Sequence, residues 1–177
     1  KPSRGLIFPY RAAKTNNPKN YKVCSQGEWQ VSRNTKRERC AKLGVMGMAI
    51  STTDPTAEIT VQLNPDSTKR WFFTRLTLLG YGDSLAVPIL IEEDESFRLP
   101  VRDEEANTFT YEFSEPQDSF RLRIIQADSV PQRFHLRGFL LENEEDGIVY
   151  HSIGVNGASV PSYLSCEDFT EELSLIK

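Results

Sequence analysis

The residues between Gly147 and Ser159 have the types and spacing of a backbone site for an anion. An apolar run at 148–150 leads into Gly154, Asn156 and Gly157. Glycines three residues apart let the backbone turn tightly and approach another group closely. The N–H groups at a turn between a strand and a helix point outward and can stabilise a negative charge. The stretch therefore predicts a strand that ends in a glycine turn before a helix.

A serine offers a second kind of chemistry. Gly82-Asp-Ser-Leu85 matches the motif after which the GDSL esterases are named, where the serine nucleophile lies between a strand and a helix. Here Pro88 follows within an expected strand, so the tetrapeptide is expected in the loop of a β-hairpin and Ser84 is a decoy nucleophile. His135 and His151 also lie within expected strands, with no Asp-x-x-His pattern, so packed or surface roles are favoured over catalysis.

Aromatic side chains suggest a third kind of site, a platform on which sugar rings stack. The candidates are Trp29, Trp71 and Tyr81. Stacking requires exposed rings, whereas aromatic residues on strands usually fill a core. Two acidic turns, at 92–95 and 103–105, are expected to be solvated, with calcium binding as the alternative. No metal site and no cofactor are predicted.

Composition and charge argue against several classes of protein. The chain has 177 residues, 38% of them hydrophobic and 26% charged, with a net charge of −4, as is usual in a globular domain. A mildly acidic chain does not favour nucleic-acid binding, and no apolar run is long enough to cross a membrane. Three cysteines and two histidines form no zinc pattern. Cys24 and Cys40 could pair across a loop, but unpaired thiols are favoured, with Cys166 left over.

The elements that must position these residues are mostly strands. Alternating apolar residues and frequent turns are typical of an antiparallel β-sandwich or jelly roll, similar to carbohydrate-binding modules. A change of apolar face at Gly138 predicts a bulge, and the turn at 143–147 is expected to return the chain as the strand that carries the glycine turn. The expected strands cover 29–33, 45–51, 57–63, 70–79, 87–91, 97–101, 108–113, 120–126 and 133–142.

Three segments follow from these patterns. Residues 1–20 form an extended basic arm, which lies solvated on the domain or docks on a neighbouring one through Phe8 and Tyr10. Residues 21–151 form the β-sandwich, and 152–177 form the glycine turn and a short helical tail. Helical spacing in the tail places Phe169, Leu173 and Ile176 on one stripe. Ser165 or Asp168 is the expected helix cap.

The stretch at 136–158 resembles a region of SGNH-type, GDSL-like bacterial esterases that carry a β-sandwich inside or before the catalytic domain. In that family a strand is followed by Gly-x-Ser-Gly, whose last glycine supplies an N–H to the oxyanion hole. Gly154-Val-Asn-Gly157 is similar, with Asn156 at the serine position, so the resemblance implies that Gly157 is an oxyanion glycine. The residues at 4–10 and 13–15 resemble the segment that follows the nucleophile block.

The nucleophile block and the Asp-x-x-His block are not found in these residues. The resemblance therefore implies that 152–177 is one edge of an incomplete SGNH-type α/β domain. We expect the chain to be a piece of a longer protein, with the remainder of that catalytic domain as its partner.

The expected function is that of a non-catalytic β-sandwich module of a GDSL/SGNH-type esterase or acylhydrolase, acting on acylated carbohydrate in the longer protein. The resemblance implies a secreted, periplasmic or cell-surface location in a bacterium. Carbohydrate is a further candidate partner, whereas nucleic acid and a membrane span are not expected. The alternatives are a stand-alone carbohydrate-binding or protein-interaction sandwich, and a catalytic esterase that uses Ser84.

Overall fold

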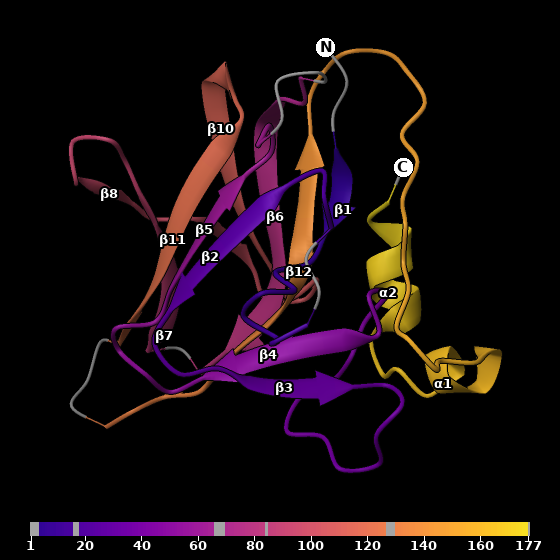
Figure 1. Ribbon diagram of the computed structural model, residues 1–177. Helices are drawn as coiled ribbons and strands as arrows, with labels where there is room; N and C mark the ends of the chain where they lie inside the picture. Colours follow the sequence, from indigo (N-terminus) through magenta and orange to yellow (C-terminus); the bar gives the residue numbers. More distant parts are fainter. Residues whose placement is uncertain (1–3, 16–17, 66–69, 84, 127–129, 177) are drawn as a thin grey trace.

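The computed structural model describes residues 4–15, 18–65, 70–83, 85–126 and 130–176, which form two antiparallel sheets and a short helical tail (Figure 1). The predicted mostly-β sandwich is confirmed. The larger sheet runs in the order β3 (Gln30–Arg33), β4 (Met48–Thr52), β12 (Phe134–Glu142), β6 (Phe73–Gly82), β10 (Thr108–Gln117) and β9 (Val101–Asp103), with β1 (Gly5–Ile7) also on β12. The smaller sheet runs in the order β2 (Lys22–Gln26), β5 (Glu58–Gln62), β11 (Ser119–Gln126), β7 (Ala86–Ile91) and β8 (Phe97–Arg98).

The core lies between the two sheets and follows from the alternation of the strands. On β11, Phe120, Leu122 and Ile124 point inward and are buried. The Phe120 ring meets Phe73 of β6 at a centroid distance of 5.8 Å and Phe139 of β12 at 5.0 Å, both edge to face. Such pairs add to the gain from burying their apolar area, so these rings join the sheets into one core.

β12 is the strand on which the larger sheet is built. One of its edges pairs with β6 along most of its length. Its other edge is shared: residues 134–136 pair with β4, and residues 139–141 pair with β1. Gly138 lies between these two stretches with a φ of +151°, and the register against β6 shifts there. The predicted bulge at Gly138 is therefore confirmed.

The N-terminal residues belong to the sandwich and not to a separate basic arm, which corrects the boundary placed at residue 20. Gly5, Leu6 and Ile7 pair with β12, and Phe8 is completely buried. Tyr21 reaches back to this segment, because its hydroxyl donates to the Phe8 carbonyl oxygen at 2.8 Å. Apolar residues, rather than the interspersed cations, decide where this segment lies.

Two predicted hairpins are not present. Gly82 ends β6 in the larger sheet and Ala86 begins β7 in the smaller one, so this turn crosses between sheets. The expected strand at 148–150 is also wrong, because residues 143–159 contain no strand. They run as an irregular connection down the side of the molecule beside β1 (Figure 1). Ile148 and Tyr150 point to solvent and are 102% and 83% exposed.

The tail, defined here as residues 143–176, ends in two short helices, α1 (Val160–Leu164) and α2 (Phe169–Ser174). The predicted stripe of Phe169, Leu173 and Ile176 is only partly right, because Leu173 is 48% exposed. The buried residue of α2 is Glu172. Asp168 stands at the N-cap of α2 but makes no side-chain capping bond there.

Replacement of Gly138 by Ala tests the role of the bulge. A Cβ at Gly138 would lie 3.1 Å from the Ile7 carbonyl oxygen, and a φ of +151° is one that residues with a Cβ rarely adopt. We expect a loss of about 1–3 kcal/mol in the free energy of unfolding, measured with urea. Gly147→Ala is the matched control, since nothing lies within 4 Å of that Cβ. Equal stability of the two variants would contradict the assigned role.

Candidate functional site

Gly157 lies in a tight turn on the exposed part of the tail. Asn156 and Gly157 form its centre, Gly157 has a φ of +81°, and the Ala158 N–H donates to the Val155 carbonyl oxygen at 2.9 Å. This is the backbone of a type II turn, which favours glycine at its third position. The turn follows an irregular segment instead of a strand, and the helix after it has only five residues. The implied strand–turn–helix arrangement is therefore not formed by the described residues.

The two segments that carry the resemblance meet in space. A cavity of about 500 Å³ lies between the turn that follows β1 and the glycine turn of the tail. Tyr10 and Lys14 line one side of it, and Gly154 and Asn156 line the other. Arg33 of β3 also contributes to its lining. Gly157 itself is not among the described residues that line this cavity.

The tail is held against β1 close to this cavity. The Leu6 N–H donates to Nδ1 of His151 at 3.2 Å. Gly5 leaves space for the tail, because a Cβ there would come within 2.8 Å of both Val149 and His151 side-chain atoms. Burial lowers the pKa of His151, which favours the neutral ring that this acceptor role requires.

A buried ion cluster fixes the other end of the tail. Arg137, on the outer face of β12, is 1% exposed and pairs with Asp168 and with Glu172 of α2, the latter at 2.6 Å. The second carboxylate oxygen of Glu172 accepts the Val45 N–H at 2.8 Å. Burial raises the pKa of Glu172, and the Arg137 guanidinium opposes that rise. The cluster joins β12, the segment before β4 and α2.

Beside Arg137 lies a serine–histidine pair that the sequence did not suggest. Ser51 Oγ is 2.7 Å from Nδ1 of His135, and the imidazole stacks on Tyr81 at 4.5 Å. Cys40 adds a contact, with its Sγ 3.8 Å from Ser51 Oγ. Ser51 is 1% exposed, and burial lowers the pKa of His135 to about 4. A buried hydroxyl next to so weak a base is poorly suited to attack a substrate, and the pair instead links β4 to β12 through a side-chain hydrogen bond.

Ser84, the decoy nucleophile, lies outside the described residues. Its neighbours can be placed: the Asp83 N–H donates to the Arg133 carbonyl oxygen, and the Ala86 N–H donates to that of Asp83. β7 begins at Ala86, so a strand and not a helix follows the tetrapeptide. This agrees with the expectation that the tetrapeptide stands outside a nucleophile's usual context.

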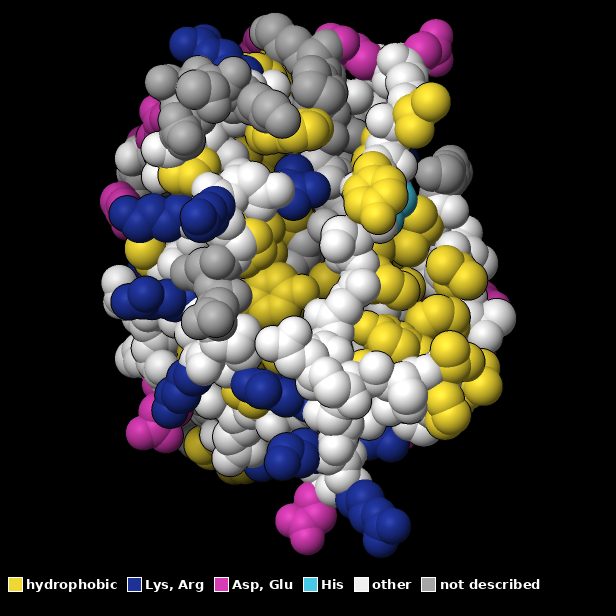
Figure 2. All heavy atoms as spheres, turned by 45° about the vertical axis from the view of Figure 1, so that its right-hand side comes forward, with side chains coloured by type: hydrophobic (Ala, Val, Ile, Leu, Met, Phe, Trp, Pro, Cys, Tyr) yellow, Lys and Arg dark blue, Asp and Glu magenta, His cyan; other side chains and the backbone are white. Residues whose placement is uncertain are grey.

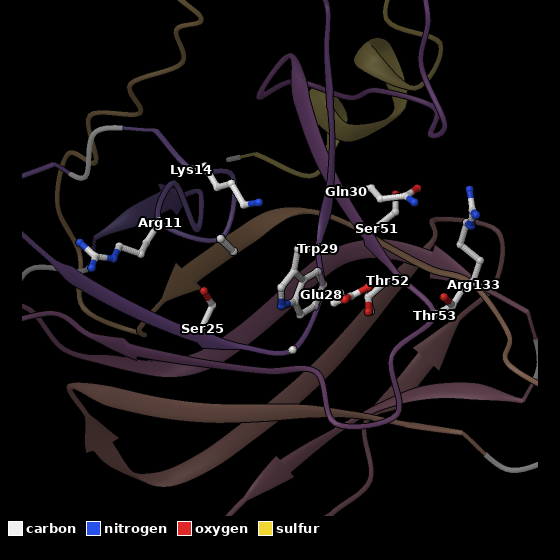
Figure 3. Close-up of a pocket in the computed structure, with 12 residues that line it drawn as sticks. Arg11, Lys14, Ser25, Glu28, Trp29, Gln30, Ser51, Thr52, Thr53 and Arg133 are labelled. Carbon is white, nitrogen blue, oxygen red and sulfur yellow. The ribbon is translucent and has the colours of Figure 1, made fainter.

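The three candidate stacking residues lie in three different places. Trp29 is 9% exposed and lines a pocket between β2, β3 and β4 (Figure 3). Trp71 is half-buried, with the Arg4 guanidinium 5.7 Å from its ring centre. Tyr81 is covered by His135 and accepts the Lys42 N–H on its hydroxyl at 2.7 Å. No described pocket brings two of these rings together, so they do not form one platform.

Other expectations about metals, thiols and membranes can be compared with the described residues. Cys24, Cys40 and Cys166 are free, so Cys24 and Cys40 do not pair. Within the described ranges, no group of three or more His, Cys, Asp or Glu side chains is placed to hold a metal ion. Among these residues there is also no helix with the length and apolar character needed to cross a membrane.

Sequence reasoning missed Arg137, Glu172 and Ser51 as structurally important polar residues. One signal was present for Arg137, which stands between Leu136 and the apolar run at 139–141. A charge at such a position is buried only when it is paired. Comparison with known proteins adds no assignment: neither a scan of protein-family models nor a search of curated proteins found a match to this chain.

Glu172→Gln tests the ion cluster. The amide keeps the shape of the side chain but removes the charge that faces buried Arg137, so we expect a loss of about 1–4 kcal/mol in unfolding free energy. Proteolysis within 143–159 should also become faster, because α2 anchors the tail. Glu171→Gln, on the exposed neighbour, is the matched control. A Glu172→Gln protein as stable and as protease-resistant as this control would contradict the anchoring role.

His135 predicts a pH dependence of stability. Its pKa is about 4 in the folded chain and 6.5 when unperturbed, so the unfolded chain binds the proton first as pH falls. The stabilisation is complete above about pH 6.5 and declines towards pH 4. Relative to His135→Gln, the natural chain should lose about 1–3 kcal/mol across that window, measured by urea unfolding at each pH. A stability difference that stays constant with pH would contradict this assignment.

Proposed function

We propose that this chain is the non-catalytic β-sandwich module of an SGNH-type, GDSL-like esterase or acylhydrolase and carries one edge of its catalytic domain. The observation that supports this most directly is the cavity shared by Tyr10, Lys14, Gly154 and Asn156. These residues come from the two segments that resemble the hydrolase, and they are about 140 positions apart in the sequence. A nucleophile-bearing segment at this cavity would lie beside the glycine turn.

The exposed apolar residues of the tail support the same proposal. Ile148 and Tyr150 project from the connection, and Val160 and Leu164 project from α1, at exposures between 73% and 102%. Figure 2 shows hydrophobic side chains gathered on this face of the molecule. Contiguous exposed apolar surface marks sites of interaction, and here the partner in our proposal is the remainder of the catalytic domain.

The chemistry of the lining supports a non-catalytic role for this part alone. Among the described residues at the cavity there is no serine, cysteine, histidine or carboxylate. The cavity therefore offers backbone groups, the phenol of Tyr10 and the cations Lys14 and Arg33, which suit stabilisation of a negative charge better than nucleophilic attack. In our proposal Gly157 supplies one oxyanion N–H, and the nucleophile and base come from the other segments.

The proposal extends to substrate and location. An esterase of this type in the longer protein would act on acylated carbohydrate. Its location would be secreted, periplasmic or at the cell surface of a bacterium. Both statements rest on the resemblance at 4–15 and 150–158.

Two measurements on esterase activity test the proposal. The chain alone should hydrolyse p-nitrophenyl acetate no faster than buffer. Turnover that disappears in Ser51→Ala or Ser84→Ala would instead make one of these serines a nucleophile and overturn the non-catalytic assignment.

The second measurement uses the protein encoded by the complete gene, which should contain Gly-Asp-Ser before Lys1 and Asp-x-x-His after Lys177. In that protein Gly157→Ala should lower kcat/KM at least about tenfold, because a Cβ at a φ of +81° would reorient the donor N–H. Gly147→Ala serves as the control and should keep full activity. Absence of both blocks from the gene would refute the proposed family relationship.

A further inference from the structure

The pocket that contains Trp29 shares Lys14 with the cavity at the tail but is otherwise lined by different residues. It has a volume of about 340 Å³ and lies between the turn after β1, the β2–β3 connection and the end of β4. Figure 3 shows Arg11 and Lys14 on one side, Arg133 on the opposite side, and the Trp29 ring between them. The pocket thus combines cations on two sides with an aromatic ring.

The charge of this pocket is opposite to that of the whole chain. Arg11, Lys14 and Arg133 line it, and the only carboxylate among its described lining residues is that of Glu28. The chain as a whole carries a net charge of −4. Within the described part of the protein, none of the three cationic side chains forms an ion pair with a carboxylate, so their charges are available to a ligand.

Backbone hydrogen bonds order the turn that carries the first two cations. The turn that follows β1 is closed by the Lys14 N–H, which donates to the Arg11 carbonyl oxygen at 3.0 Å, and by the Thr15 N–H, which donates to that of Tyr10 at 3.0 Å. Ala12 and Ala13 anchor this turn in the core. Because the backbone is already ordered, binding at this side requires ordering of the exposed Arg11 and Lys14 side chains but not of the chain that carries them.

The aromatic part of the pocket is equally fixed. Nε1 of Trp29 donates to the Gln26 carbonyl oxygen at 2.9 Å, which sets the orientation of the ring. The Glu28 N–H donates to Asp54 Oδ2 at 2.8 Å and ties the β2–β3 connection to the loop after β4. Trp29 is 9% exposed and lines the pocket, so a small part of the residue is available to a bound molecule.

The remaining lining is rich in neutral hydrogen-bonding groups. Ser25, Gln30, Thr52 and Thr53 line the pocket and add hydroxyl and amide groups to the three cations. Such groups suit a ligand with several hydroxyls, and the volume is at the lower end of the range of small-molecule sites. A bare phosphate or sulfate ion would leave most of this lining without a partner.

We propose that this pocket binds a carboxylated saccharide of one or two sugar units, with its carboxylate groups held mainly by the guanidinium groups of Arg11 and Arg133 and with Lys14 adding positive charge. The sugar hydroxyls form hydrogen bonds with the neutral polar groups, and an apolar edge of the sugar ring contacts Trp29. This site goes beyond the esterase-module proposal and does not depend on it, because Lys14 is the only described residue that lines both this pocket and the cavity at the tail. It differs from the predicted sugar platform, since neither Trp71 nor Tyr81 takes part.

Binding can be measured through the Trp29 fluorophore. The chain has two tryptophans, so Trp71→Phe leaves Trp29 as the sole indole, and addition of digalacturonic acid should change its emission. The dimethyl ester of the same disaccharide and inorganic phosphate are the comparison ligands. We expect affinity for digalacturonic acid at least about tenfold above either of them, with weakening as NaCl rises from about 20 mM to about 500 mM.

Charge-neutralising variants locate the site. In the Trp71→Phe background, Arg11→Gln combined with Arg133→Gln should weaken binding at least about tenfold, because two guanidinium groups are lost. Arg70→Gln, an exposed arginine outside this pocket, is the matched control and should bind normally. Both arginines of the double variant are exposed, so urea unfolding should show an unchanged fold.

Several results would overturn the proposal. The proposal is wrong if digalacturonic acid gives no saturable response up to about 10 mM, because an affinity weaker than this is negligible. It is also wrong if the dimethyl ester or phosphate binds as tightly as digalacturonic acid, or if the double variant binds as tightly as the Trp71→Phe protein. Esterase activity in the complete protein is a separate measurement, so failure of this site and failure of the esterase-module proposal are distinguishable.

Discussion

The burial of one guanidinium governs how the outer layer of this protein is built. Arg137 projects from β12 on the face opposite the core, and its charge is removed from water. An unpaired charge in such a place would be strongly destabilising. The carboxylates of Asp168 and Glu172 pair with this charge, and the Val45 N–H donates to the remaining oxygen of Glu172. The burial of this one side chain therefore links α2 and the segment before β4 to β12, beside the packing of Phe169 and the Leu43 N–H bond to Glu167.

Much of the fold could be predicted from the sequence because alternation records which face of each strand is buried. β11 and β12 were placed from this pattern, and the change of face at Gly138 identified the bulge. The apolar run at 148–150 has the same composition as a strand but does not pair with β1, whose Leu6 N–H donates to the His151 ring. Composition can indicate that a segment favours pairing, but the availability of an edge is a property of the assembled sheet.

The candidate sites could be predicted less well, because their parts are distant in the sequence. Arg133 and Lys14 line the same pocket although they are far apart in the sequence, and no local motif relates them. Trp29 was singled out for its type, yet its pocket depends on Asp54, which ties two connections together. By contrast, Gly82-Asp83 belongs to an eye-catching tetrapeptide, and its surroundings are those of a crossing between sheets. Sequence spacing indicates chemistry only where the fold places the residues in the matching context.

The pairing of β1 with β12 also bears on the order in which this protein is made. Gly5 pairs with Leu141, so the first described strand can find its place only after nearly the whole sandwich has left the ribosome. Contacts between residues so far apart in sequence are slow to form because a long loop must close first. Until then, the apolar segment from Leu6 to Phe8 has no sheet to cover it and stays exposed to water.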